Sequence, residues 1–153
     1  GPVIDKLAKE GNPHAVEFPR IMLEENSYDF SFSGLKTSVI NYLHNKEQKG
    51  EEIIVKDVAA SFQQAVIDVL VEKTFRLAHE YNFDKIVISG GVSANDGIRS
   101  AFEKRGEEEG IKIYYPKKIL CTDNAAMIAS AGYYLYKSGN YDKETTANPN
   151  LGL

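Results

Sequence analysis

The feature that most constrains the fold is the stretch from Lys85 to Asn95, in which a short run of β-branched residues ends in two adjacent glycines. A run of this kind is typical of a strand that is buried on both faces of a sheet. The glycines permit a tight turn, and a helical pattern follows them over residues 95–109. The stretch therefore predicts a strand, a glycine turn and a helix, which is the arrangement at which open α/β sheets bind ligands.

The rest of the sequence places further helices and strands around this unit. Apolar residues at helical spacing predict helices over residues 3–9, 35–45, 55–81 and 123–137, and the third of these carries a long apolar stripe. Period-two alternation and β-branched content predict strands over residues 28–32 and 111–115. A charged linker is predicted over residues 46–52. The alternation of helices and strands predicts a layered α/β lobe.

Composition excludes some functional classes. Of the 153 residues 42% are hydrophobic, the net charge is -4, and the lone cysteine is Cys121. A nucleic-acid contact would therefore depend on a local patch or a partner. No apolar run reaches the roughly 20 residues of a membrane helix, and no signal peptide is recognisable, so we expect a cytoplasmic protein without a membrane partner. The absence of an initiator Met leads us to expect a piece of a longer chain, in which Gly1-Pro2 is either native or the remnant of a removed tag.

The strongest candidate for ligand binding is the glycine turn itself. Gly90 and Gly91 leave backbone N–H groups bare next to a helix N-terminus, where phosphate groups bind favourably. Asn95 either points its amide at such a ligand or serves as an ordinary N-cap.

A second candidate is Asp123, which precedes the last predicted helix. Its carboxylate either caps that helix or is one ligand of a divalent metal, and a single carboxylate does not make a metal site. We expect Asn95 and Asp123 to cap helices that open toward one shared cleft. Lys36 follows a Ser-Gly pair without the spacing of a phosphate loop, so it is predicted to be a solvated first-turn residue. The alternative is that Lys36 and Thr37 face an anionic ligand or a partner. Cys121 is predicted to be a small buried residue rather than a nucleophile.

Other polar residues give no site by themselves. The three histidines are scattered without a His-x-x-x-His pair, so they are predicted to lie at the surface: His14, His44 and His79. The tyrosines of the last predicted helix are expected to pack it or to meet a partner: Tyr133, Tyr134 and Tyr136.

Five segments, in this order along the chain, resemble the TsaD family: Gly1–Ala8, Phe30–Thr37, Asp57–Gln63, Ser89–Asn95 and Cys121–Ala129. The resemblance implies an actin-like ATPase (ASKHA) lobe of α/β class, with a mixed sheet flanked by helices. It implies that residues 1–139 form this lobe, as the C-terminal half of a two-lobed protein, and that residues 140–153 form a polar tail.

The family transfers a threonylcarbamoyl group from threonylcarbamoyl-AMP to N6 of a tRNA adenosine next to the anticodon, so the resemblance implies tRNA and an adenine nucleotide, ATP or threonylcarbamoyl-AMP. Gly90, Gly91 and Asn95 match the family's nucleotide contacts. Gly1 matches the second glycine of its Tyr-Pro-Gly-Gly-Pro segment. Asp123 matches the aspartate that binds a metal, iron or zinc, together with two histidines of the family's N-terminal half. Without those histidines we expect poor metal binding and an inactive fragment, and we name no catalytic residue.

The resemblance also implies partner proteins: a TsaB-like pseudo-enzyme paralogue, a TsaE-like ATPase helper and the enzyme that makes the adenylate. Two alternatives remain. A non-catalytic paralogue is expected to have lost Asn95 and Asp123, which are present here. A metal-dependent peptidase needs a metal-activated water and a carboxylate base, and no His-Glu-x-x-His segment is present.

Overall fold

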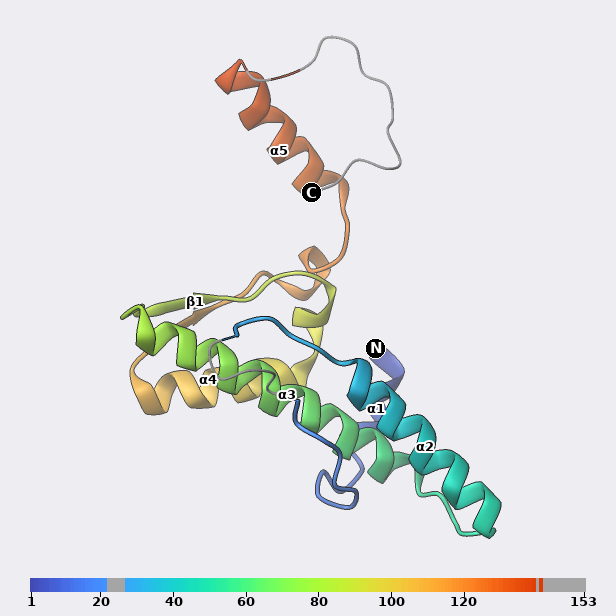
Figure 1. Cartoon of the computed structure of the whole chain (residues 1–153). Helices are drawn as coiled ribbons and strands as arrows, with labels where there is room; N and C mark the ends of the chain where they lie inside the picture. Colours follow the sequence, from blue (N-terminus) through green and yellow to red (C-terminus); the bar gives the residue numbers. More distant parts are fainter. Residues whose placement is uncertain (22–26, 140, 142–153) are drawn as a thin grey trace. The chain divides into compact units, whose positions relative to one another are not determined.

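The computed structural model describes residues 1–21, 27–139 and 141, and it divides the chain into two compact units, Gly1–Cys121 and Thr122–Leu153. Figure 1 labels the main elements. The first unit contains α1 (Pro2–Ala8), α2 (Ser33–Lys49), α3 (Val55–Glu80), β1 (Lys85–Val87), the 3-10 helix η1 (Gly91–Ala94), α4 (Asp96–Glu109), β2 (Lys112–Tyr114) and the 3-10 helix η2 (Lys118–Leu120). The second unit contains α5 (Ala125–Ser138).

The sheet of the first unit consists of β1 and β2, which run parallel and are connected through α4. The register pairs Lys85 with Lys112 and Val87 with Tyr114. The predicted strands before Gly90 and over residues 111–115 are confirmed, with shorter bounds. Among the described residues every strand pair is parallel, so the mixed sheet is not observed there.

The prediction that the first strand is buried on both faces is wrong for this unit. Ile86 is buried, whereas the neighbouring Val87 is 72% exposed. The reason is that helices cover one face of the sheet: Ile86 packs into a cluster with side chains of α3 and α4, among them Phe75 and Phe102.

The helix α3 supports two hydrophobic clusters, one along each half of its length. Its C-terminal half packs against α4 and the sheet through Ile67, Val71, Phe75 and Ala78. Its N-terminal half contributes Val58 and Ala65 to a cluster that also contains Phe18 and Leu35. The prediction that one stripe of this helix is buried is confirmed, and the structure shows in addition that the stripe contributes to two clusters.

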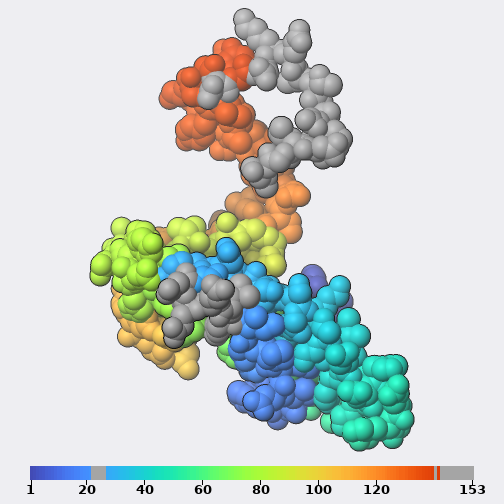
Figure 2. Space-filling model, in the orientation of Figure 1, coloured from blue at the N-terminus to red at the C-terminus, as the bar shows by residue number. Residues whose placement is uncertain are grey.

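The segment after α1 is tied to the first turns of α3 by side chains. The carboxylate of Asp57 accepts a hydrogen bond from the amide of Asn12 at 2.8 Å. The buried Ser61 hydroxyl accepts from the amide of Val16 at 3.1 Å and donates to the carbonyl of Asn12 at 3.2 Å. Figure 2 shows this segment (blue) beside α2 (cyan) on one face of the unit.

The predicted strand over residues 28–32 is wrong, because these residues form no strand in the structure. Two cationic side chains of α3 bind the backbone carbonyls of this region instead. Lys73 Nζ donates to Asp29 O at 2.5 Å, and Arg76 donates to Ser27 O at 2.8 Å. A carbonyl that is held by a side chain is withdrawn from ladder pairing.

The predicted linker over residues 46–52 is also partly wrong, because α2 continues to Lys49. Gly50 ends this helix with φ 64°, in the left-handed conformation that a helix C-terminus favours. The charged residues of the predicted linker therefore belong mainly to an exposed helix end.

The second unit is described by the helix α5 and the residues on either side of it. The cap of α5 is Asn124, whose Oδ1 accepts from the amide of Met127 at 3.0 Å, so the prediction that Asp123 caps this helix is wrong. No described side chain of α5 is buried, and its tyrosines are exposed. The predicted tail lies outside the described residues, except Tyr141, and the boundary at residue 139 stays a prediction. No helix in the described ranges is long and apolar enough to cross a membrane.

Candidate functional site

The residues Gly90–Asn95, which we call the glycine loop, connect the end of β1 to the start of α4. Gly90 has φ 84° and ψ 172°, a backbone conformation that is open essentially to glycine alone. Its carbonyl accepts two hydrogen bonds from Ser93, one from the amide at 3.0 Å and one from the hydroxyl at 2.7 Å. The carbonyl of Gly90 is thus turned inward, onto a residue of the same loop.

The opposite side of the glycine loop is open. A Cβ atom placed on Gly90 or on Gly91 would meet no atom within 4 Å. Within the described part of the chain, the amides of Gly91 and Val92 have no hydrogen-bond acceptor. Free amides beside open space can receive an anionic or otherwise electronegative ligand, because such groups form a concave arrangement of partial positive charge.

Asn95 caps α4, since its Oδ1 accepts from the amide of Ile98 at 2.9 Å. This confirms the capping prediction for Asn95. Its Nδ2 donates to Oε1 of Gln63, on α3, at 2.8 Å. Gln63 was missed as a site residue, although it ends the Asp57–Gln63 segment that contributed to the family resemblance. It fixes which way the Asn95 amide faces, and the second proton of that Nδ2 remains for a ligand.

An ion-pair triad surrounds the first residue of α4. Asp96 is bound by Lys118, in η2, and by Lys9, at the end of α1, where the Lys9 Nζ lies 2.7 Å from a carboxylate oxygen. The hydrogen bonds from Lys118 and then from Lys9 lower the pKa of Asp96 to about 2. The helix N-terminus is therefore already accompanied by one carboxylate and two ammonium groups.

The remaining predicted site residues lie apart from the glycine loop in sequence. Gly1 is the N-cap of α1, and its carbonyl accepts from the amide of Asp5 at 3.1 Å. Asp123 belongs to the second unit, where its side chain is exposed. Lys36 is exposed and Cys121 is buried, as predicted. The expectation of a cleft shared by Asn95 and Asp123 stays a prediction.

The residues that the structure describes do not form a complete metal site by themselves. In residues 1–21, 27–139 and 141, no group of three His, Cys, Asp or Glu side chains is arranged to hold a metal ion. The three histidines are exposed, as predicted: His14, His44 and His79. Asp123 offers one carboxylate ligand, whereas a bound metal needs several ligands.

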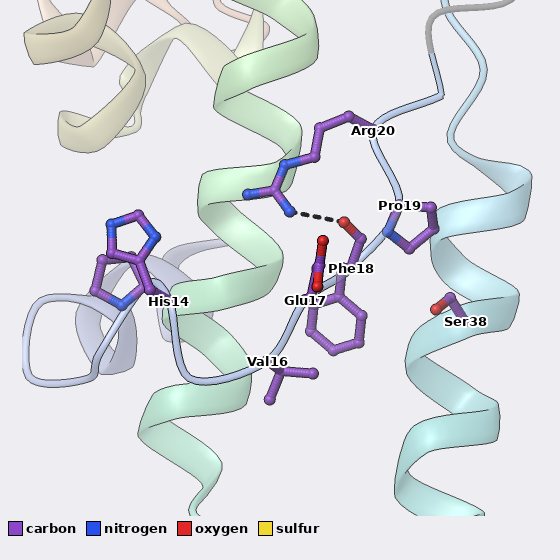
Figure 3. Close-up of a pocket in the computed structure, with 8 residues that line it drawn as sticks. His14, Val16, Glu17, Phe18, Pro19, Arg20 and Ser38 are labelled. Atoms are coloured by element: carbon purple, nitrogen blue, oxygen red, sulfur yellow. Dashed lines mark hydrogen bonds between the residues drawn. The ribbon is translucent and has the colours of Figure 1, made fainter.

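A separate surface hollow is lined by side chains of residues 13–20 and by Ser38 of α2 (Figure 3). The hollow is lined in part by the cationic side chain of Arg20. Figure 3 shows this side chain turned toward the carbonyl of Phe18, to which it donates a hydrogen bond at 2.7 Å. Arg20 also pairs with Asp68 at 3.0 Å. Because its guanidinium is engaged within the fold, the hollow offers less for an anion than the glycine loop does.

The chain matches a family model described as TsaD: tRNA N6-adenosine threonylcarbamoyltransferase, over residues 1–130. A curated relative named tRNA N6-adenosine threonylcarbamoyltransferase from Clostridioides difficile is 55% identical over 100% of this chain and 46% of its own length. Relatives of the same name from Bacillus subtilis and Moorella thermoacetica are 56% and 55% identical, over 91% and 89% of this chain and 40% of each relative. The chain therefore spans less than half the length of these relatives.

Proposed function

We propose that this chain, which belongs to the TsaD family of tRNA N6-adenosine threonylcarbamoyltransferases, forms the C-terminal half of a two-lobed, actin-like transferase. The whole enzyme would move threonylcarbamoyl from threonylcarbamoyl-AMP to N6 of a tRNA adenosine next to the anticodon. The observation that carries this proposal for the chain itself is the open glycine loop, which lies in the segment that the family model matches.

In this proposal the glycine loop binds the adenylate part of the donor. The free amides of Gly91 and Val92 face an acceptor group of the nucleotide, and the absence of side chains at Gly90 and Gly91 lets the ligand approach the backbone. Asn95 adds an amide proton whose direction is set by Gln63. Gly1 is proposed as a further contact to the nucleotide.

The chemistry that such a site supports is an acyl transfer from an activated donor. The tRNA amine nitrogen forms a bond to the carbamoyl carbonyl carbon, the bond from that carbon to the phosphate oxygen breaks, and AMP leaves with the electron pair. The amine proton passes to solvent. Holding the donor in a fixed orientation reduces the barrier, because AMP is already a good leaving group.

We further propose that Asp123 supplies one ligand of a divalent metal, iron or zinc. The remaining ligands would come from the portion of the protein that the relatives have and this chain lacks. Such a metal would supply charge to polarise an oxygen of the donor.

The partners that we propose follow from the same family assignment. They are tRNA, a TsaB-like paralogue and a TsaE-like ATPase helper, and the proposed location is the cytoplasm. This fragment alone is expected to be inactive.

A chimera tests the proposed function. The part of the Bacillus subtilis relative that this chain does not span would be joined to this chain, and the product would be incubated with tRNA and threonylcarbamoyl-AMP. Digestion of the tRNA and mass spectrometry of its nucleosides would report the modified adenosine. We expect product from the chimera and none from this chain alone. A correctly folded chimera that forms no product would refute the transferase proposal.

The variant Gly91→Leu then tests the role of the glycine loop. An added Cβ at this position meets no atom within 4 Å, so we expect an unchanged unfolding midpoint, while the leucine enters the space proposed for the adenylate. We expect kcat/KM for the adenylate to fall by about tenfold or more, or roughly 1.4 kcal/mol of transition-state binding. Glu107→Leu, which adds apolar bulk at an exposed position of α4, is the matched control. Equal activity of the two variants would remove the glycine loop from the proposed site.

A further inference from the structure

The guanidinium of Arg99, on α4, lies behind the glycine loop and binds it at its backbone. Arg99 Nε donates to the carbonyl of Ser93 at 2.5 Å. The same group donates through Nη2 to the carbonyl of Pro116 at 2.9 Å and to Cys121 Sγ at 3.1 Å. Its guanidinium carbon lies 4.2 Å from the ring centroid of Tyr115. One side chain thus joins the glycine loop to the segment that follows β2.

The surroundings of Arg99 are built to hold it. Ser93 and Cys121 are each 4% exposed, and the Ser93 hydroxyl lies 3.3 Å from the Cys121 sulfur. The ring of Tyr115 lies against the guanidinium and limits its movement on that side. A planar fork with several fixed donors can satisfy two carbonyls and a sulfur at once, whereas the ammonium of a lysine cannot reproduce this geometry.

The glycine loop benefits from such a restraint because its two glycines make no side-chain contacts. Gly90 and Gly91 have no side chain with which to pack, and their outer side is open. A glycine segment that is ordered only on binding loses conformational entropy at that moment, which weakens the binding of its ligand. A hydrogen bond that fixes the Ser93 carbonyl reduces this cost in advance, since it orients the peptide group between Ser93 and Ala94.

We propose that Arg99 is a positioning residue that holds the glycine loop in its ligand-binding conformation by tying Ser93 O to the segment Pro116–Cys121. This inference rests on the proposed function only for the identity of the ligand. The restraint itself is a property of the first unit and can be measured without any ligand.

Hydrogen exchange on this chain is the first test. In Arg99→Leu we expect the hydrogen-bonded amides of the glycine loop, Ser93 and Asn95, and those of residues 120–121 to exchange about tenfold faster or more, while amides in the middle of α3 keep their rates. The matched control is Arg105→Leu. Arg105 lies on the same helix and also faces an aromatic ring, that of Phe75, but it pairs with Glu109 and Glu72 instead of the glycine loop.

Arg99→Lys serves if Arg99→Leu does not fold, because it keeps the charge and the aliphatic stem while it loses the fork. We expect it to speed exchange in the same two segments to an intermediate degree. Unchanged exchange of the glycine loop in a folded Arg99 variant would overturn the inference, as would equal acceleration in the Arg105 variant.

A kinetic test in the active chimera connects the restraint to the ligand. We expect Arg99→Lys to raise KM for threonylcarbamoyl-AMP by about tenfold with kcat changed by less than about twofold, because the lost ordering is recovered on binding. Unchanged KM would overturn the link between the loop conformation and the ligand. If the wild-type chimera made no product while loop exchange still accelerated, the proposed function would fail and the positioning role would stand.

Discussion

The conformation of Gly90 gives a quantitative prediction, because a residue with a side chain is strained at its φ of 84° and ψ of 172°. Alanine in this region is strained by about 1–3 kcal/mol. Replacing a glycine by alanine also reduces the conformational entropy of the unfolded chain, which stabilises the folded state by about 0.4–1 kcal/mol. The added Cβ meets no atom within 4 Å, so no clash contributes. Gly90→Ala should therefore destabilise the first unit by about 1–2 kcal/mol.

Gly110 provides a matched comparison. It ends α4 at φ 71° and ψ 20°, and an added Cβ there also meets open space. In this left-handed helical region alanine is strained by about 1–2 kcal/mol, so the net loss for Gly110→Ala should be about 0.5–1 kcal/mol after the same unfolded-state gain. The glycine loop variant should thus lose more stability than the helix-end variant.

Urea unfolding followed by far-ultraviolet circular dichroism measures the difference. With a slope of about 2 kcal/mol/M, the midpoint of Gly90→Ala should fall by roughly 0.5–1 M at unchanged slope. Gly110→Ala should also leave donor binding by the active chimera intact, whereas Gly90→Ala should weaken it. A Gly90→Ala midpoint equal to or above that of Gly110→Ala would refute the backbone argument.

Two further predictions concern polar side chains. Because the pKa of Asp96 is lowered on folding, its ion pairs contribute fully to stability above pH 3.8, and this contribution is lost as the pH falls through about 2. A carboxyl NMR titration of Asp96 should therefore give a midpoint near 2, and Lys118→Met should move this midpoint back toward 3.8. Asn124→Ala should remove the cap of α5 and destabilise this helix by about 0.5–2 kcal/mol, measured as faster exchange of its first amides, whereas Asp123→Ala should leave those amides unchanged. Equal effects of the two alanine variants would contradict the observed cap.

The part of the fold that could be predicted from the sequence is the part that local patterns determine. The β-branched run before Gly90 and the apolar stripe of α3 gave the strands and the long helix within a few residues. The glycine pair likewise located the open loop, because few other residues accept the backbone conformation of Gly90.

The errors arose where distant residues compete with a local pattern. Residues 28–32 alternate like a strand, but Lys73 and Arg76 bind the carbonyls of this region from more than forty positions away. At α5, Asp123 and Asn124 are both good capping residues, and Asn124 adopts the extended backbone of a cap.

The support of the glycine loop was missed for a similar reason. Gln63 and Arg99 contact the loop through hydrogen bonds that depend on how α3 and α4 pack. In the sequence, Gln63 is visible only as the end of a family segment, and Arg99 only as the residue one helical turn after Asn95.

The shared role of α3 has a consequence for how the first unit unfolds. One uninterrupted helix contributes to the cluster around Phe75 and to the cluster around Leu35. Loss of either cluster would expose half of the apolar stripe of α3, and that half of the helix would fray because a short unsupported helix is marginal in water. The remaining cluster would then pack against a helix that is no longer held at one end. The two clusters should therefore melt together as one cooperative block, although they share no side chain.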